Sequence, residues 1–404
     1  SNGLDYDSSG TLTVRNSHIT TTKVDSTNEV YRPVQVRTGV LDISSSTVEG
    51  IQSAAEDGSI IDSSGYIQGI DIKDGVADAS VIDDVTFQGE LGDAIQIRNT
   101  NGVTVKNSEF DGTSTNNDEG VAVNIGGTGA EPGDNVEIEG NTFNSYGTVL
   151  YADGAGDGEE TGTNPEGVKF NNNVLQDIGG LGGGFDFAAV ENQDDSNEID
   201  ATQNYWGAAS GPSGEGNGDG ASITTGVNYI PWYPTSSLDS VMFAATSTDS
   251  GDKAATTTAT TTLSDNTGNS SVELEKDTQI TGSSDWDGMI NKPAVKDQTS
   301  GTEPSFTGKE TTTEKVVEVG SNVSLALSKP ARIAMTGEAG KKVGLTRSGE
   351  DFHEIDIECG DSVSDASSAA SFLDEQEINE CKMNSGDNLV VWTNHFTDFV
   401  TFTT

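Results

Sequence analysis

The chain has 404 residues, enough for two or three domains, and a formal net charge of −46 from 66 acidic and 20 basic residues. This excess of acid argues against nucleic acids and anionic membranes as partners, because their phosphates would be repelled. No apolar run of about 18 residues occurs, so no membrane-spanning segment is predicted. The acids fit a solvated, salt-tolerant surface of the halophilic kind or divalent-cation sites, and their spread along the chain favours the surface.

An internal repeat runs through the first half of the chain, and the segment NGVTVKNSEFDG, residues 101–112, shows its pattern most clearly. Apolar residues lie at offsets 0, 2 and 7 from Val103. A search with this pattern finds eight copies, of which the third and fourth are weaker. The copies start at residues 12, 41, 60, 80, 103, 136, 168 and 199.

The repeat predicts short strands joined by corners. Offsets 0 and 2 place two side chains on the same face of a strand. Turn-forming residues such as Asn107 and Ser108 follow, and the residue at offset 7 then faces the same interior after the bend. Repeated without helical periodicity, this pattern describes the coils of a parallel β-solenoid, each buried by its neighbours. The alternative is a β-sandwich whose strands fit the pattern by chance.

The copies resemble the repeat of pectate-lyase-type right-handed parallel β-helices. The segment NYWGAASGPSG, residues 204–214, followed by GVNYIPWYP, is similar to the closing coil of many secreted and surface β-helix proteins. This resemblance covers residues 1–236. It implies that Trp206, Trp232 and Tyr233 cover the last coil, where large aromatic side chains bury its apolar end.

The composition changes after the β-helix. Residues 237–270 are rich in Thr, Ser, Ala and Asp and contain few large apolar residues, which predicts a linker. Alternating segments such as VELEKDTQI and NLVVWTNHF then predict a β-sandwich over residues 271–404. Cys359 and Cys381 lie in this part; in a secreted protein they would pair, and two buried thiols are the alternative.

The second half also resembles a known type of domain. The segments KDTQITGSSDWDGMI, KPARIAMTGEAGKKVGL and GDNLVVWTNHFTDFVTFT, with the two cysteines, are similar to a C-terminal domain of large surface proteins in uncultivated candidate-phylum bacteria. The resemblance implies an exported protein and no catalytic role for this domain. The expected fold is therefore all-β, with a right-handed parallel β-helix, a linker and a C-terminal β-sandwich.

A glycan-directed enzyme is one functional reading of a β-helix. Lyases and hydrolases with this fold place carboxylates and basic side chains on one strand face. Here Asp83, Asp84 and Asp93 could form such a patch, with Arg98 as the nearest base. The alternative is solvent-facing and turn acids in a chain that has 66 of them. No coil pairs acids with Arg or Lys in a clear catalytic arrangement, so the sequence predicts no enzyme.

Self-cleavage is a second reading, carried by His395-Phe396-Thr397. This tripeptide resembles the cleavage site of some autoproteolytic β-sandwich domains. There the hydroxyl, here that of Thr397, attacks its own preceding carbonyl with the histidine as base. The alternative is the edge of a last strand, with Phe396 and Phe399 packed inside.

The segment YADGAGDGEETG suggests a metal site in a corner loop. Four acids are the candidate ligands for Ca²⁺, the one cofactor considered: Asp153, Asp157, Glu159 and Glu160. The spacing lacks the pattern of an EF-hand, and a solvated insertion is the alternative. The three histidines are too scattered to predict zinc.

The start of the stack suggests how the protein works. The first copy begins at residue 12, with no capping segment before it. An uncovered coil exposes strand edges and apolar interior, which invites pairing with another chain; a trimmed chain and a short cap are the alternatives. We therefore predict a secreted or cell-surface structural or adhesive protein that self-assembles into a filament or array through β-edge contacts. The rival hypothesis is a β-helix protein that binds or cleaves surface glycans.

Overall fold

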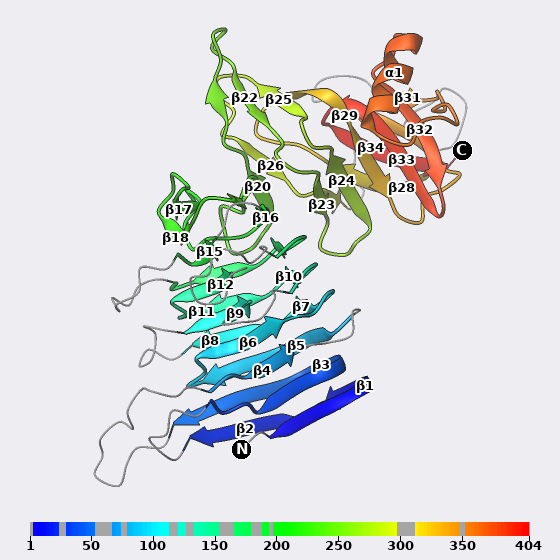
Figure 1. The fold of residues 1–404 in the computed structure, drawn as a ribbon. Coiled ribbons are helices and arrows are strands. Elements are labelled where there is room, and N and C mark those ends of the chain that lie inside the picture. Colours follow the sequence, from blue (N-terminus) through cyan, green and yellow to red (C-terminus); the bar gives the residue numbers. More distant parts are fainter. Residues whose placement is uncertain are drawn as a thin grey trace. The chain divides into compact units, whose positions relative to one another are not determined.

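The computed structural model describes residues 3–23, 30–52, 67–73, 79–112, 120–126, 133–153, 165–178, 188–193, 197–296, 312–346 and 352–403. The chain divides into two compact units, Ser1–Leu238 and Asp239–Thr404. The first holds a large parallel sheet and the second antiparallel sheets (Figure 1). This confirms the predicted fold class, a parallel β-helix together with a C-terminal β-sandwich.

The first unit is a stack of coils (Figure 1, blue to green) in which the described strands join one continuous sheet. In chain order these strands are β1 (Leu4–Arg15), β2 (His18–Lys23), β3 (Val34–Gln52), β4 (Ile70–Lys73), β5 (Val81–Gly89), β6 (Asp93–Arg98), β7 (Thr104–Lys106), β8 (Glu109–Gly112), β9 (Val121–Ile125), β10 (Glu137–Glu139), β11 (Thr142–Asn144), β12 (Thr148–Ala152), β13 (Lys169–Asn171), β14 (Val174–Gln176), β15 (Val190–Asn192), β16 (Ile199–Asp200), β17 (Pro212–Gly214), β18 (Gly220–Ile223) and β19 (Val227–Asn228).

Successive coils pair in parallel with the predicted repeat in register. Offset 2 of each copy pairs with offset 2 of the next: Val14 with Ile43, Ile43 with Ile82, Ile82 with Val105, Val105 with Ile138, and Ile138 with Phe170. The copy predicted at residue 60 lies outside the described residues except for Ile67, and β3 pairs directly with β5, so no coil of this copy separates them. Ile67, which completed the pattern there, pairs with Tyr31 instead.

Each coil turns its corner in the same way. The residue at offset 4 has a positive φ in every copy that is in register: Asn16, Ser45, Asp84, Asn107, Gly140, Asn172 and Gln203. This left-handed conformation suits glycine, asparagine and aspartate better than β-branched residues. The chain therefore bends within two residues and returns the offset-7 side chain to the interior.

A ladder of polar side chains runs through these corners at offset 5. Each backbone N–H donates to the side chain of the next coil: Ser108 N to Asn141 Oδ1 at 2.9 Å, Asn141 N to Asn173 Oδ1 at 2.9 Å, and Asn173 N to Asn204 Oδ1 at 2.8 Å. Serine fills the same position earlier in the stack, where Val85 N donates to Ser108 Oγ. The ladder satisfies buried corner amides that strand pairing does not reach.

Three successive coils carry phenylalanine at offset 7 in the interior of the stack. The rings of Phe87 and Phe110 lie 4.6 Å apart, and the same distance separates Phe110 from Phe143. All three side chains are fully buried. This separation matches the spacing of adjacent strands, about 4.8 Å, so in-register pairing itself brings the rings into contact.

The second unit contains a β-sandwich of an eight-stranded and a five-stranded antiparallel sheet. Strands β20 and β26 form a separate two-stranded sheet. Its elements are β20 (Ser240–Met242), β21 (Thr246–Ser247), β22 (Lys253–Thr256), β23 (Thr261–Ser264), β24 (Ser270–Leu274), β25 (Gln279–Gly282), β26 (Met289–Asn291), β27 (Ala294–Lys296), β28 (Thr312–Glu318), β29 (Leu325–Met335), β30 (Lys342–Thr346), β31 (His353–Ile355), α1 (Ala366–Gln376), β32 (Glu380–Ser385), β33 (Asn388–His395) and β34 (Asp398–Thr403).

The segment 237–270, expected to be a linker, is folded. It supplies β20 to β23 to the second unit, and three of its large apolar residues, Val241, Phe243 and Leu263, are buried. The low-complexity composition was misleading because threonine is a good strand former. In β23, Thr261 and Leu263 face inward while Thr262 and Ser264 are exposed.

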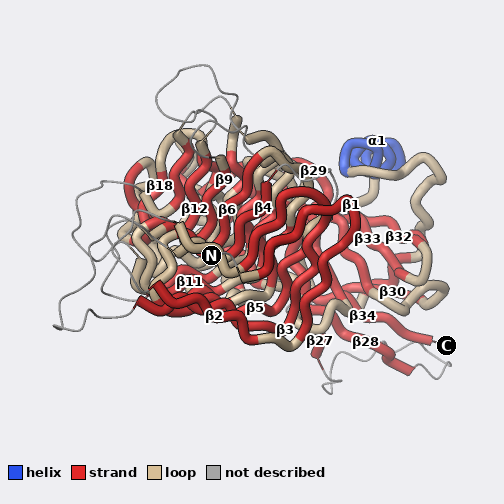
Figure 2. The backbone as a smooth tube through the Cα atoms, turned by 60° about the horizontal axis from the view of Figure 1, so that its bottom comes forward, coloured by secondary structure: helices blue, strands red, loops and turns tan. Residues whose placement is uncertain are grey.

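Helix α1 is the one α-helix in the described part of the chain (Figure 2, blue). Asp365 caps it, since its side chain accepts from the Ser368 N–H and the Ser368 side chain returns to the cap. Leu373 packs into a cluster with Cys381 and Trp392. No helix in the described residues has the length and apolar character needed to cross a membrane.

Candidate functional site

The first coil has an exposed strand edge, which we call the first-coil edge and define as β1 and β2. Both strands pair with β3 on one side, and no described residue pairs with them on the other. Leu4 is 39% exposed, and Leu12 and Ile19 are half-buried. The corresponding residues of the next coil, Val34, Leu41 and Val48, are completely buried.

Charged side chains of the first-coil edge are bound to the second coil. Arg37 Nε donates to Asp5 Oδ1 at 2.9 Å, and this hydrogen bond raises the pKa of Arg37. Arg15 pairs with Asp42, and His18 Nε2 lies 2.8 Å from Glu49 Oε2. The edge therefore carries mostly compensated charge although the chain as a whole is strongly acidic.

The first-coil edge carries only part of the common protection against strand addition. Natural edge strands are interrupted by proline, lysine, inward-facing charges or bulges. β1 has the sequence LDYDSSGTLTVR, without proline or lysine, although its register shifts between Tyr6 and Thr11. β2 has the sequence HITTTK, in which the one lysine is the last residue. The register of β1 with β3 is unbroken only in Leu4–Tyr6 and in Thr11–Arg15.

The far end of the stack is closed by aromatic residues. The structure places the three predicted cap residues in its last turn: Trp206 and Tyr233 are fully buried and Trp232 is 8% exposed. Tyr205 pairs with Tyr233, and Trp232 Nε1 donates to the Ala209 carbonyl at 3.1 Å. Burial raises the pKa of Tyr233 to about 12.

A buried ionic cluster lies on the face formed by β3, β4 and β6. The Asp71 carboxylate is inaccessible to solvent and accepts from Arg98 Nη2 at 2.5 Å. Arg32 Nε lies 2.9 Å from the same carboxylate and donates to Gln68 Oε1 at 2.8 Å. Gln35 Nε2 donates to the same carboxylate at 2.7 Å. Asp71 therefore ties three successive coils together, and its charge is fully compensated, as a buried carboxylate requires.

Basic residues gather around this cluster. Lys73 in β4 pairs in register with Arg98 in β6. Arg37 in β3 comes one residue after Val36, which pairs with Ile72, the residue before Lys73. With Arg32, four of the eight Lys and Arg residues of the first unit lie in these three coils. Arg98 Nε is buried and has no hydrogen-bond partner among the described residues. This is the most basic face of the described β-helix.

The acidic patch predicted from the sequence is divided between separate contacts. Asp83 lies 3.6 Å from Lys106 Nζ and accepts from Asn107, and Asp84 accepts from Ser45. Asp93 accepts from Gln68 Nε2 at 3.1 Å. Arg98, the base assigned to this patch, binds Asp71, which was not among the predicted site residues.

The predicted calcium loop lies largely outside the described residues, which include Asp153 but not Asp157, Glu159 or Glu160. Asp153 follows β12, where burial, with smaller contributions from Asp153 and Glu191, raises the pKa of Tyr151 to about 12. In the part of the chain that is described, no group of three or more His, Cys, Asp or Glu side chains could hold a metal ion.

In the second unit the two cysteines of the chain form a disulfide, Cys359–Cys381. Cys381 lies in β32 and is fully buried in the cluster that packs against α1. The bond therefore joins the segment before α1 to the strand after it, and no thiol remains free.

The tripeptide His395-Phe396-Thr397 forms the connection between β33 and β34, which belong to different sheets of the sandwich. His395 Nε2 lies 2.9 Å from Glu380 Oε1, and both side chains are largely buried. Thr397 is 9% exposed, and its carbonyl accepts from the Val319 N–H. The alternative to self-cleavage predicted that Phe396 and Phe399 are packed inside. Phe399 is buried, whereas Phe396 is half-buried.

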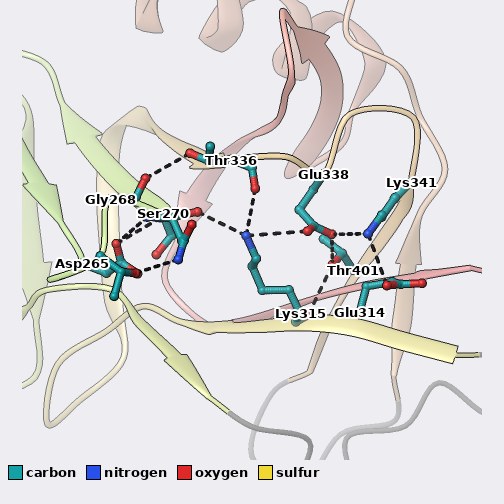
Figure 3. Close-up of polar contacts among 11 residues, drawn as sticks. Asp265, Gly268, Ser270, Glu314, Lys315, Thr336, Glu338, Lys341 and Thr401 are labelled. Atoms are coloured by element: carbon teal, nitrogen blue, oxygen red, sulfur yellow. Dashed lines mark hydrogen bonds and ion pairs between the residues drawn. The ribbon is translucent and has the colours of Figure 1, made fainter.

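A second ionic network joins the two sheets of the sandwich (Figure 3). Glu338 is 6% exposed and lies 3.6 Å from Lys315 Nζ and 3.3 Å from Lys341 Nζ, while Thr401 Oγ1 donates to it at 2.7 Å. Lys315 Nζ also donates to the Thr336 carbonyl at 2.9 Å. Each group is used in holding β28, β34 and the loop after β29, which indicates a structural role.

Comparison of the chain with protein-family models, with curated proteins and with solved structures gives no match.

Proposed function

We propose that this protein is a structural or adhesive component of an extracellular surface, and that it associates with further strands through the first-coil edge. The observation that carries the proposal is the contrast between this edge and the rest of the stack. Leu4, Leu12 and Ile19 keep part of their surface in solvent, whereas interior positions in the next coil have none. Exposed strand edges with apolar flanks are templates for pairing with another chain.

The charge distribution supports association at this edge. Each chain carries a formal net charge of −46, so two chains repel one another over most of their surface. At the first-coil edge, by contrast, Asp5 and Arg15 are paired with the second coil. Salt screens the remaining repulsion, with a Debye length near 10 Å at about 0.1 M, and should strengthen association.

Sedimentation velocity and electron microscopy of the full chain test this proposal. We expect a larger species that increases with protein and salt concentration. Monomers at every salt and Ca²⁺ concentration would contradict it.

A second candidate function is glycan binding at the basic face of β3, β4 and β6. The observation that favours it is the concentration of Arg32, Arg37, Lys73 and Arg98 in three coils of an acidic chain. Carboxylate-bearing polysaccharides should then bind, and Lys73→Gln should weaken binding more than Asp93→Ala. A screen of acidic and neutral polysaccharides by affinity electrophoresis separates this function from the first, since it predicts retention without self-association.

A further inference from the structure

Two segments of the second unit have the pattern Asn-X-Ser, in which X is not proline: Asn269-Ser270-Ser271 and Asn322-Val323-Ser324. An exposed segment of this pattern is an acceptor for N-linked glycans in exported proteins, because the transferring enzyme binds the asparagine amide together with the hydroxyl two residues later. None of the 21 asparagines of the first unit has serine or threonine at that distance. Attachment at this pattern is therefore restricted to the second unit.

The segment around Asn322 is open to an enzyme. It lies in the connection between β28 and β29, outside the strands, and both Asn322 and Ser324 are exposed. Asn322 Nδ2 donates one hydrogen to the Asp285 carbonyl at 3.0 Å. A primary amide carries two such hydrogens, so a sugar can replace the second while the first keeps its hydrogen bond. The folded chain therefore presents the amide and the hydroxyl of this segment together.

The segment around Asn269 is held in a sheet instead. The Asn269 side chain is exposed, but Ser270 is only 2% exposed and lies in β24. Ser271 lies between two partners, Ser264 in β23 and Ala334 in β29. The hydroxyl-bearing residue thus belongs to a central strand, and an enzyme cannot bind it together with the Asn269 amide while the chain is folded.

We propose that Asn322 carries an N-linked glycan, added to the folded chain, and that Asn269 does not. In this step Asn322 Nδ2 forms a bond to the anomeric carbon of an activated glycosyl phosphate donor. The bond between that carbon and the phosphate oxygen breaks, the phosphate leaves with the electron pair, and the transferring enzyme takes up one Nδ2 proton. The inference rests on the extracellular location in the proposed function, because export brings the chain to such enzymes.

Peptide mapping by mass spectrometry tests this inference on the full chain isolated from the cells that naturally make it. We expect the peptide that contains Asn322 to be heavier than its sequence by the mass of a glycan, and the peptide that contains Asn269 to have its sequence mass. Ser324→Ala removes the hydroxyl and should abolish the added mass, whereas the matched control Ser324→Thr keeps a hydroxyl and should retain it. Ser324 is exposed, so neither variant should change the fold, which circular dichroism verifies.

The outcomes separate this inference from the proposed function. A glycan on Asn322 alone, lost in Ser324→Ala and kept in Ser324→Thr, supports the site and its selection by the folded chain. An unmodified Asn322 in chain recovered from the cell surface would overturn the inference and leave the proposed function standing. A glycan on Asn269 as well would overturn the selection by the fold. Chain found only inside the cell would overturn the location on which the inference and the proposed function both rest.

Discussion

Replacing Asn173 by alanine tests whether the ladder at the corners stabilises the stack. The side chain is completely buried. Its Oδ1 accepts from Asn141 N at 2.9 Å and from Asn141 Nδ2 at 3.1 Å. Its Nδ2 donates to the Ile138 carbonyl at 2.9 Å and to Asn204 Oδ1 at 3.1 Å. One truncation therefore removes contacts with both neighbouring coils.

The expected cost follows from the groups that lose their partner. The Asn141 N–H is buried, and an unsatisfied buried donor costs about 1–3 kcal/mol. The remaining side-chain hydrogen bonds contribute roughly 1 kcal/mol each. With three such bonds, we expect Asn173→Ala to lower the free energy of unfolding by about 4–6 kcal/mol. Asn173→Ser should cost less, because Ser108 already serves as acceptor at the same offset.

Urea unfolding and hydrogen exchange measure this effect. The control is Asn144→Ala in the preceding coil, where the side chain donates to Asp111 on the surface and the expected change is within about 0.5 kcal/mol. Exchange of the Asn141 amide should accelerate in Asn173→Ala and not in the control. Equal destabilisation by both substitutions, or no advantage of serine over alanine, would refute the role of the ladder.

Three further predictions concern the ionic cluster, the disulfide and the cap. Asp71→Ala leaves Arg32 and Arg98 without their shared carboxylate and should lower stability by about 3–5 kcal/mol in thermal melts, whereas Asp84→Asn, which keeps a residue type suited to that positive-φ corner, should change little. The double substitution Cys359→Ser with Cys381→Ser should cost roughly 3 kcal/mol, and dithiothreitol should reproduce its urea midpoint in the unsubstituted chain. Burial raises the pKa of Tyr233 to about 12, above the value near 10 of an unfolded tyrosine. The stabilisation by the neutral Tyr233 side chain is therefore complete below pH about 10 and is lost as the pH rises toward 12. In Tyr233→Phe, which cannot ionise, the free energy of unfolding should depend less on pH between about 10 and 12.

The β-helix was predictable because one physical requirement recurs at one place in each coil. Inward positions such as Val105 and Ile138 must be apolar, and the corner residue must tolerate a positive φ. Both leave a readable pattern of residue types. The copy predicted at residue 60 rested on two apolar residues seven positions apart, a spacing that does not by itself fix the register of a coil. Only the pairing of β3 with β5 shows the register.

The candidate sites were less predictable because their geometry depends on contacts between coils. Asp71 lies 27 residues from Arg98 and in another strand, so nothing local links them. The similar segments IDIK, residues 70–73, and IQIR, residues 95–98, could have indicated that the two strands are neighbours. Aligned with each other, they place Asp71 beside Gln96 and Lys73 beside Arg98. The segment 237–270 failed for a different reason, since its composition fits both a linker and short threonine-rich strands.

The use of the scarce bases explains how so acidic a chain can stack its coils. In the first unit, Lys169 Nζ lies 2.7 Å from Glu137, and Lys106 lies 3.6 Å from Asp83. Each pair joins neighbouring coils, as do the contacts of Arg15, Arg37 and Arg98. Exposed pairs of this kind contribute at most about 1 kcal/mol each, so they cannot hold the stack by themselves. Their effect is to remove repulsion where parallel strands would otherwise align acid beside acid, and the ladder and the aromatic interior can then hold the coils together.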